Sequence, residues 1–212
     1  MPFLPEAHHG KLIILGILVF AGDAEAGERA VAPFRKLSPI VDMVRPMKYP
    51  EIYFPDDPNF HPKAVGRTMF LDEIDRGVSE EIVARLEASD APVRVAQLRV
   101  LGGAMARVPA EATAFAHRTS PILANVAAFY EGPEDRVARE AWVTEFAATL
   151  RQGDAGTYVN FLGEEGQARV RQAYPGSSWD RLVAIKHRYD PTNLFRLNQN
   201  IPPGAMIPDA LV

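Results

Sequence analysis

Four stretches of this chain have the pattern of β-strands, and the way they alternate with helical patterns limits its possible folds. Apolar and β-branched residues dominate residues 12–20, 66–71 and 122–130, and successive side chains of residues 93–101 are expected on opposite faces of a strand. Helical patterns separate these stretches but do not follow each strand in turn, as a parallel βαβ arrangement requires. We therefore expect an α+β fold, in which a mainly antiparallel sheet has helices on one face and a helical segment follows at the C-terminus.

The first of these stretches belongs to the longest apolar run of the chain, residues 12–22. Its β-branched residues predict a strand that is buried on both faces. The run is too short to cross a bilayer as a helix, for which about 20 residues are needed. It also lacks the basic start and the small-residue cleavage site of a signal peptide. We therefore expect no membrane partner and a cytoplasmic location.

The composition excludes several classes of protein. The chain has 212 residues, of which 47% are hydrophobic, enough to bury a sizeable core and to exclude disorder. Its 27 acidic and 23 basic residues leave no cationic surplus for nucleic acid. The absence of cysteine excludes disulfides, thiolate metal sites and cysteine nucleophiles. The histidines lack the spacing of metal ligands, so we expect no metal.

Helix signals recur between and after the strands. Asp23 and Ser79 precede two helical patterns and are expected to cap them, and Ser177 with Asp180 forms a capping pattern for a third. Residues 157–161 predict a short strand with Tyr158 and Asn160 on one side. The expected helices cover residues 24–37, 80–88, 134–151, 164–173 and 179–189.

Three segments resemble one family of flavoproteins. The sequences YVNF at 158–161 and RLVAIKHRYDPTNLFRLNQNIPP at 181–203 resemble the C-terminal signature of berberine-bridge-enzyme-like FAD-linked oxidases, which are of the vanillyl-alcohol-oxidase type. The sequence GGAMARVPAEATAFAHR at 102–118 is similar to a loop between two strands of the family's substrate domain. The first 30 residues are similar to the start of that domain in bacterial members.

The resemblance implies two parts in this chain. Residues 1–152 are expected to form the substrate-binding α+β domain, and residues 153–212 the C-terminal segment that completes an FAD domain. That FAD domain, with its pyrophosphate loop and flavin attachment residues, is not found in the sequence. FAD is therefore expected to bind only with an N-terminal domain or a partner chain, and the exposed docking surface is expected to favour such a partner or self-association.

The resemblance also assigns roles to polar residues near the C-terminus. It places Tyr158 beside the flavin, as a candidate base that takes a hydroxyl proton from the substrate. The alternative is a half-buried tyrosine with a packing role. Asn160, Asn198 and Asn200 are candidate flavin-binding amides, although asparagine is also common in turns.

Two further amides are candidates for substrate binding. Plant members of the family carry an acidic base on a strand, at a position that falls within residues 123–125 here, where only Asn125 is polar and no acid is present. Gln97, on the neighbouring strand, is expected to line the same pocket or to be a solvated strand residue. For His117 and Arg118, a structural role in holding the loop is favoured over catalysis.

Two functions remain open at this point. The resemblance favours an FAD-dependent oxidoreductase that oxidises an alcohol, a small-molecule substrate, by hydride transfer to flavin. The alternative is a non-catalytic α+β binding or interaction fragment that binds no flavin.

Overall fold

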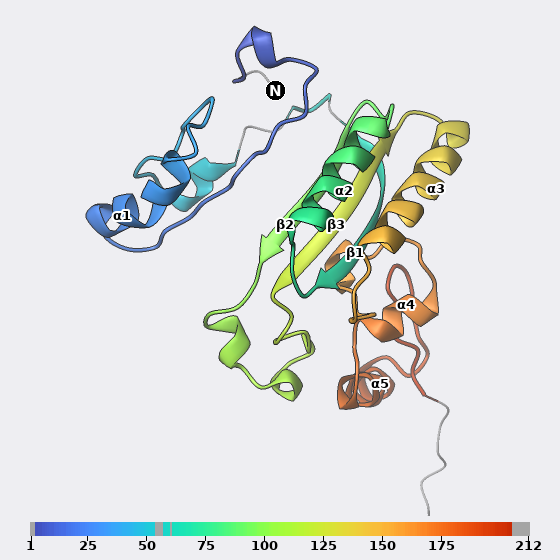
Figure 1. Cartoon of the computed structure of the whole chain (residues 1–212). Coiled ribbons are helices and arrows are strands. Elements are labelled where there is room, and N and C mark those ends of the chain that lie inside the picture. Colours follow the sequence, from blue (N-terminus) through green and yellow to red (C-terminus); the bar gives the residue numbers. More distant parts are fainter. Residues whose placement is uncertain (1–2, 54–56, 60, 205–212) are drawn as a thin grey trace, which may run out of the picture. The chain divides into compact units, whose positions relative to one another are not determined.

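A computed structural model describes residues 3–53, 57–59 and 61–204 of the chain (Figure 1). The chain divides into two compact units, Met1–His61 and Pro62–Val212. Within the described ranges, no helix combines the length and the apolar character that crossing a bilayer requires. The predicted boundary between residues 152 and 153 stays a prediction.

The first unit contains helix α1, Ala24–Arg35, and two 3₁₀ turns, η1 (Glu6–His8) and η2 (Tyr49–Ile52). The Asp23 side chain accepts a hydrogen bond of 2.8 Å from the backbone N–H of Ala26. This bond satisfies one of the free N–H groups at the start of the helix. The predicted cap is therefore confirmed.

The strand predicted over residues 12–20 is wrong. These residues have no regular secondary structure, and Ile14, Ile17 and Val19 are exposed. A strand needs a neighbour that supplies backbone hydrogen bonds, and no such pairing forms here within the described residues. The apolar pattern identified a segment suited to burial but could not identify a pairing partner.

The second unit is built on an antiparallel sheet of strands β1 (Lys63–Leu71), β2 (Arg94–Val100) and β3 (Ile122–Tyr130). Their order is β1-β3-β2, so the last strand in the sequence lies in the centre (Figure 1). The strands predicted over residues 66–71, 93–101 and 122–130 are confirmed with small changes at their ends. The predicted α+β class is confirmed as well.

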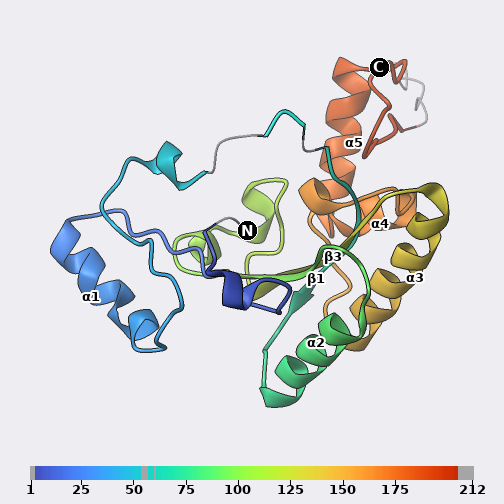
Figure 2. The same cartoon turned by 90° about the horizontal axis from the view of Figure 1, so that it is seen from above.

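Helices α2 (Arg76–Ala88) and α3 (Pro133–Leu150) lie side by side on one face of this sheet (Figure 2). Their apolar side chains and the strand residues that face them form the core, which includes Met69, Leu71, Ile82, Val126, Val143, Phe146 and Leu150. Helix α2 begins earlier than predicted, because the Asp75 carboxylate rather than Ser79 caps it by accepting from the Val78 N–H. Within the second unit, the opposite face is covered in part by other segments, since Thr157 contacts Thr68 and His117 stacks on Phe70.

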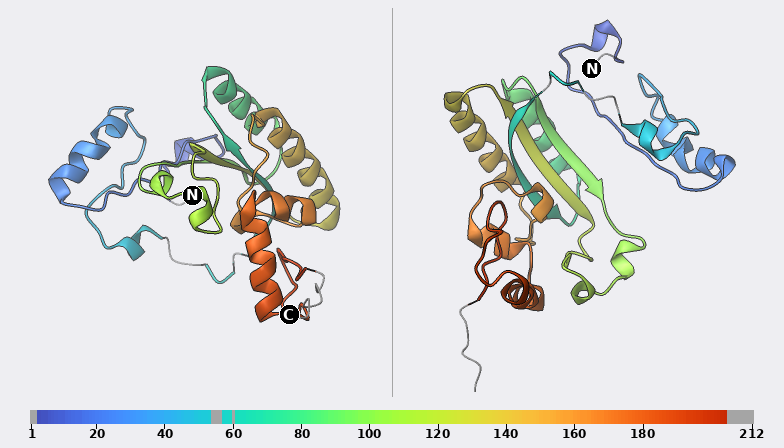
Figure 3. Two further views of the ribbon diagram at one scale, coloured as in Figure 1. Left: turned by 90° about the horizontal axis from the view of Figure 1, so that it is seen from below. Right: turned by 180° about the vertical axis from the view of Figure 1, so that it is seen from behind.

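The C-terminal segment contains the 3₁₀ turn η5 (Val159–Phe161) and helices α4 (Gln167–Gln172) and α5 (Ser177–Tyr189). Helix α5 includes Ser177, and the residue before it is Gly176 with φ +62°, so the predicted Ser177 cap is wrong. Glycine adopts this left-handed backbone without strain. Helices α4 and α5 lie at the same end of the sheet as the loop between β2 and β3, which carries η3 (Met105–Arg107) and η4 (Ala110–Ala112) (Figure 3).

Candidate functional site

A row of polar side chains crosses the face of the sheet that the helices leave free. Thr68 of β1 and Gln97 of β2 are both paired with Asn125 of the central strand. Residues directly opposite one another in an antiparallel sheet point to the same face. The three side chains therefore form one row, and it contains both amides that the sequence suggested for substrate binding.

Asn125 lies in the middle of this row and is half-buried. A Cβ atom at Gly66 of β1 would lie 3.3 Å from the Asn125 Oδ1 atom. Glycine at this position therefore leaves room for the amide to lie across β1. Asn125 is uncharged, so it can orient a substrate hydroxyl but cannot act as the acidic base of plant members.

Tyr158 and Asn160 meet in a turn, and the strand predicted for them is wrong. Tyr158 precedes η5, and its carbonyl oxygen accepts from the Phe161 N–H at 2.9 Å. This local bond replaces the bonds to a neighbouring strand that a β conformation would need. The turn nevertheless brings the two side chains together, because Asn160 Nδ2 donates to Tyr158 Oη at 2.7 Å.

Aromatic rings surround Tyr158 and orient its phenol. The Phe115 ring lies edge-on to the Tyr158 ring with centroids 5.5 Å apart, and the Phe161 ring is tilted against it at 5.8 Å. Phe115 comes from the loop between β2 and β3, which approaches the C-terminal segment here. Edge-on aromatic contacts at such distances add to the energy of burial. The phenol therefore has a defined direction, with Asn160 at its oxygen.

The loop residues His117 and Arg118 have different environments. His117 is buried and stacks on Phe70 of β1 with ring centroids 4.3 Å apart. Burial lowers the pKa of His117, and the Asp154 carboxylate, whose Oδ2 lies 3.7 Å from Nδ1, opposes this shift. Arg118 donates to the Thr113 hydroxyl and the Phe115 carbonyl oxygen, so it holds the loop in shape. The structural role predicted for Arg118 is confirmed.

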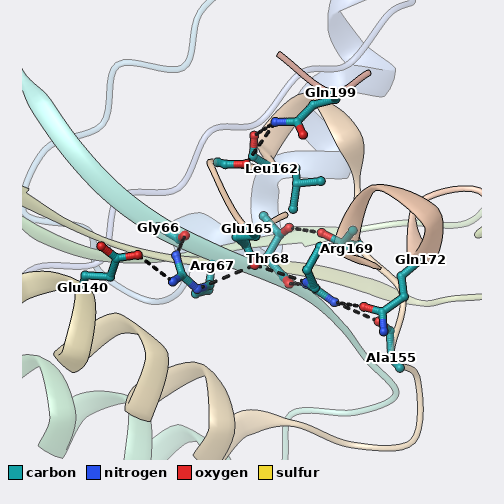
Figure 4. A network of polar contacts seen from close by, with 12 residues as sticks. Gly66, Arg67, Thr68, Glu140, Ala155, Leu162, Glu165, Arg169, Gln172 and Gln199 are labelled. Atoms are coloured by element: carbon teal, nitrogen blue, oxygen red, sulfur yellow. Dashed lines mark hydrogen bonds and ion pairs between the residues drawn. The ribbon is translucent and has the colours of Figure 1, made fainter. Parts of the chain in front are cut away.

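A second set of polar contacts, some of which are drawn in Figure 4, fixes the segment just before Tyr158. The Thr157 and Thr68 hydroxyl oxygens lie 2.6 Å apart, and both side chains are buried. Arg169 of α4 donates to the carbonyl oxygens of Ala155 at 3.0 Å and Thr68 at 3.1 Å. These bonds attach the C-terminal segment to β1 directly beside the polar row.

The carboxylate of Glu165 links the same two elements (Figure 4). It lies 3.6 Å from the Arg67 guanidinium of β1 and 3.2 Å from that of Arg169. Only 6% of its side chain is exposed, so the ion pairs are largely shielded from water. These two ion pairs hold α4 against the edge strand β1 and so support the position of Tyr158.

The two tail amides predicted to bind flavin, Asn198 and Asn200, lie on either side of a residue that holds the tail in place. Gln199 Nε2 donates to the Leu162 and Gly163 carbonyl oxygens at 2.7 and 3.0 Å, which brings the tail back to the residues after η5. Asn198 is exposed, with φ +60°. The Asn200 Oδ1 atom is buried, without a hydrogen-bond partner among the described residues. It can accept a bond from a ligand N–H group.

The same tail is held at its start by Asp190. Its carboxylate accepts from the Lys186 ammonium and from the backbone N–H groups of Leu194 and Phe195. The hydrogen bond from Lys186 is the main cause that lowers the pKa of Asp190. The sequence YDPTNLF thus forms a turn around a buried carboxylate.

Several residues of the site were not identified from the sequence. Thr68, Thr157 and Phe115 have no pattern that separates them from ordinary strand and loop residues. Arg99 shares a strand face with Gln97, and its guanidinium lies over the Phe161 ring of the C-terminal segment, a contact that strand alternation does not predict. In the part of the chain that the structure describes, no three potential metal-ligating side chains cluster.

Comparisons with known proteins identify the C-terminal segment and part of the rest. Residues 157–202 match the family model described as berberine and berberine like. The FAD-linked oxidoreductase YgaK of Bacillus subtilis is 31% identical over 61% of this chain and 30% of its own length. The chitooligosaccharide oxidase of Gibberella zeae is 31% identical over 51% of this chain and 24% of its own length.

A solved structure supports the same relationship. BBE-like 28 of Arabidopsis thaliana superimposes with a TM-score of 0.56 and 27% identity over 68% of this chain and 34% of its own. The match thus spans about a third of that protein's length or less in each of the three relatives. The predicted resemblance is confirmed: the chain carries a berberine-like C-terminal segment and is homologous to part of the FAD-linked oxidoreductases of this family.

Proposed function

We propose that this chain provides the substrate-facing sheet and the C-terminal segment of an FAD-dependent oxidoreductase that oxidises an alcohol. The observation that carries the proposal is the hydrogen bond of 2.7 Å from Asn160 Nδ2 to Tyr158 Oη. It leaves the phenol oxygen with an oriented partner, beside a polar row on the free face of the sheet. The relatives named above, among them FAD-linked oxidoreductases, support flavin as the cofactor.

The chemistry assigned to the chain is proton transfer and substrate orientation. When bound, FAD supplies the acceptor for the hydride that leaves the carbinol carbon. Tyr158 Oη, as the phenolate, takes the hydroxyl proton, so that the alcohol becomes a carbonyl compound. The Asn160 N–H stabilises the negative charge on Oη before the proton arrives. Gln97 and Asn125 bind other hydroxyl groups of the substrate through their amides.

The residues of the C-terminal segment fit one edge of a flavin ring. Its ring carbonyl oxygens and N–H group match amide donors and acceptors. Asn160 is exposed next to Tyr158, and the Asn200 Oδ1 atom is buried with a free lone pair in the described structure. We assign these two amides, with Asn198, to the flavin. The pyrophosphate part of FAD is assigned to an FAD-binding domain.

The substrate class and the docking surface follow from this assignment. One relative is named as a chitooligosaccharide oxidase, which supports a sugar-type hydroxyl as the group oxidised. Leu194, Phe195 and Leu197 of the tail are exposed, although this segment is held in place by Asp190. An ordered but uncovered apolar segment favours association with another surface. We assign it to the FAD-binding domain.

The Tyr158→Phe variant tests the proposal in the flavin-loaded enzyme. This change keeps the ring contacts with Phe115 and Phe161 but removes the oxygen that takes the proton. We expect kcat for alcohol oxidation to fall by roughly 10²–10⁴ while the FAD content stays unchanged. Tyr189→Phe is a matched control, because Tyr189 is an exposed tyrosine of α5. It should leave kcat unchanged.

Asn160→Ala separates orientation from proton transfer. It removes the donor to Tyr158 Oη and one predicted flavin amide, so both kcat and the flavin occupancy or absorbance should change. A Tyr158→Phe enzyme with near-normal kcat would place the base elsewhere. An enzyme assembled with an FAD-binding domain that shows no difference in bound flavin or activity with and without this chain, measured by absorbance near 450 nm after unbound FAD is removed, would favour the non-catalytic binding fragment.

A further inference from the structure

Arg99 is the one charged side chain that the three strands place on the free face of the sheet. It lies two residues after Gln97 on β2, so both side chains point to this face. Arg67 and Arg94 belong to the opposite face, as their register with β3 requires. The other residues of the free face are apolar, glycine, threonine or amide. A single positive charge therefore lies among uncharged groups beside the polar row.

The Phe161 ring holds this charge close to Tyr158. The guanidinium carbon of Arg99 lies 4.4 Å from the centroid of the Phe161 ring, whose other contact is the Tyr158 ring. Stacking on an aromatic face restrains a guanidinium but leaves its N–H donors free in their own plane. The stack thus presents an oriented set of donors one ring away from the proposed base.

The donors of Arg99 differ from those of the other two arginines in the sheet. Arg67 pairs with carboxylates, and Arg94 donates to carbonyl oxygens of the preceding helix and turn. For Arg99, the Phe161 ring is the partner found within residues 61–204. Arg99 is exposed on an edge strand, restrained by the ring and without an acid partner among these residues. Such an arginine is suited to bind a planar anion through two parallel hydrogen bonds.

We infer that Arg99 binds an anionic group of the substrate, so that the alcohol oxidised here is an acidic one such as a hydroxy acid or a sugar acid. The inference rests on the proposed function, because it places the substrate on the free face of the sheet. The carboxylate accepts from the guanidinium, the hydroxyl to be oxidised lies at Tyr158, and Gln97 contacts the part between them. Arg99 acts as a specificity residue and takes no part in proton or hydride transfer.

A pair of probes that differ only in charge tests this inference. 4-(Hydroxymethyl)benzoate and 4-(hydroxymethyl)benzamide share the alcohol, the ring and the shape, but only the first is an anion. We titrate each into the full ¹⁵N-labelled chain at low salt and follow the Arg99 Nε–H resonance. The benzoate should shift this resonance and bind about 2- to 5-fold more tightly than the benzamide, as expected for an exposed charge pair.

Variants of Arg99 show whether this residue causes the preference. Arg99→Gln should abolish the preference for benzoate and leave benzamide binding unchanged, whereas Arg99→Lys should retain part of it. Arg76→Gln is the matched control, because Arg76 is an exposed arginine of α2. It should leave the preference unchanged. Near-native circular dichroism of each variant confirms that the fold persists.

Several results would overturn the inference. Equal affinity for the two probes would do so, as would an Arg99 resonance that shifts no more with benzoate than with benzamide at about 0.2 M, roughly the dissociation constant of an exposed ion pair. A preference that survives in Arg99→Gln would assign the anion to another residue. Because these measurements involve no electron transfer, they stand apart from the Tyr158→Phe experiment. In the flavin-loaded enzyme, Arg99→Gln should raise KM for acidic alcohols with little change in kcat.

Discussion

The buried hydroxyl pair of Thr68 and Thr157 offers a direct test of how the C-terminal segment is attached to the sheet. Their Oγ1 atoms lie 2.6 Å apart, and the two residues are 2% and 0% exposed. Thr68→Val keeps the shape but leaves the Thr157 hydroxyl buried without its partner. A buried polar group that loses its hydrogen bond destabilises a protein by about 1–3 kcal/mol, so we expect a loss of about 2 kcal/mol for either single variant.

The double variant should behave differently from the sum of its parts. When both hydroxyls are replaced by methyl groups, no polar group is left unpaired, and the stability should return to within about 0.5 kcal/mol of the original. The coupling energy between the two sites is then about 3.5–4 kcal/mol, above the usual range for residues in contact. An additive model instead predicts a loss of about 4 kcal/mol, which makes the two outcomes easy to separate.

Urea unfolding, followed by the fluorescence of Trp142 and Trp179, measures these losses. With an m-value of about 2 kcal/mol per molar urea, each single variant should lower the midpoint by about 1 M. Thr144→Val is the control, since it makes the same chemical change at an exposed position of α3. Single variants with unchanged stability would refute the hydrogen bond between the two buried hydroxyls. A double variant that loses as much stability as the two single variants together would refute it as well.

Two further predictions concern titrating groups. The pKa of His117 is lowered by burial, so the unfolded state binds a proton at this residue more readily than the folded state. The stability of the fold should therefore decrease as the pH drops below about 6.5. Urea midpoints at pH 7.5 and 5.5 measure this loss, and His117→Gln should reduce it. The pKa of Asp190 is lowered chiefly by Lys186, so its stabilisation is present above about pH 4 and is lost in acid. Asp190→Asn should lower the urea midpoint at pH 7 and release the tail to limited proteolysis, and a tail as resistant as before would contradict the role of this carboxylate.

A strand could be predicted from the sequence where the burial of its own residues is enough to define it. Residues 122–130 were expected as a strand and form β3 with the same ends, because this central strand is buried on both faces. The equally apolar residues 12–20 were expected as a strand and form none. A strand is completed by hydrogen bonds to a distant segment, and local sequence carries no information about whether that segment is in reach.

The sequence predicted which residues belong to the candidate site better than it predicted how they are arranged. Tyr158 and Asn160 were chosen by their motif, but a turn rather than a strand brings them together. Gln97 and Asn125 were chosen one at a time, and the register of the sheet places them in one row. Arg99 was visible as a neighbour of Gln97 on its strand, but its stacking on an aromatic ring from a segment some sixty positions later could not be inferred from spacing alone.

The order of the strands has a consequence for synthesis on the ribosome. β1 and β2 are both edge strands, and each is hydrogen-bonded to β3, which is made last of the three. Until residue 130 has left the ribosome, the growing chain therefore exposes the unpaired edges of β1 and β2, because the central strand β3 that pairs with both is not yet available. Such edges invite pairing with other chains. We expect nascent chains that stop before β3 to need chaperones, whereas chains that extend past it close the sheet in a single step.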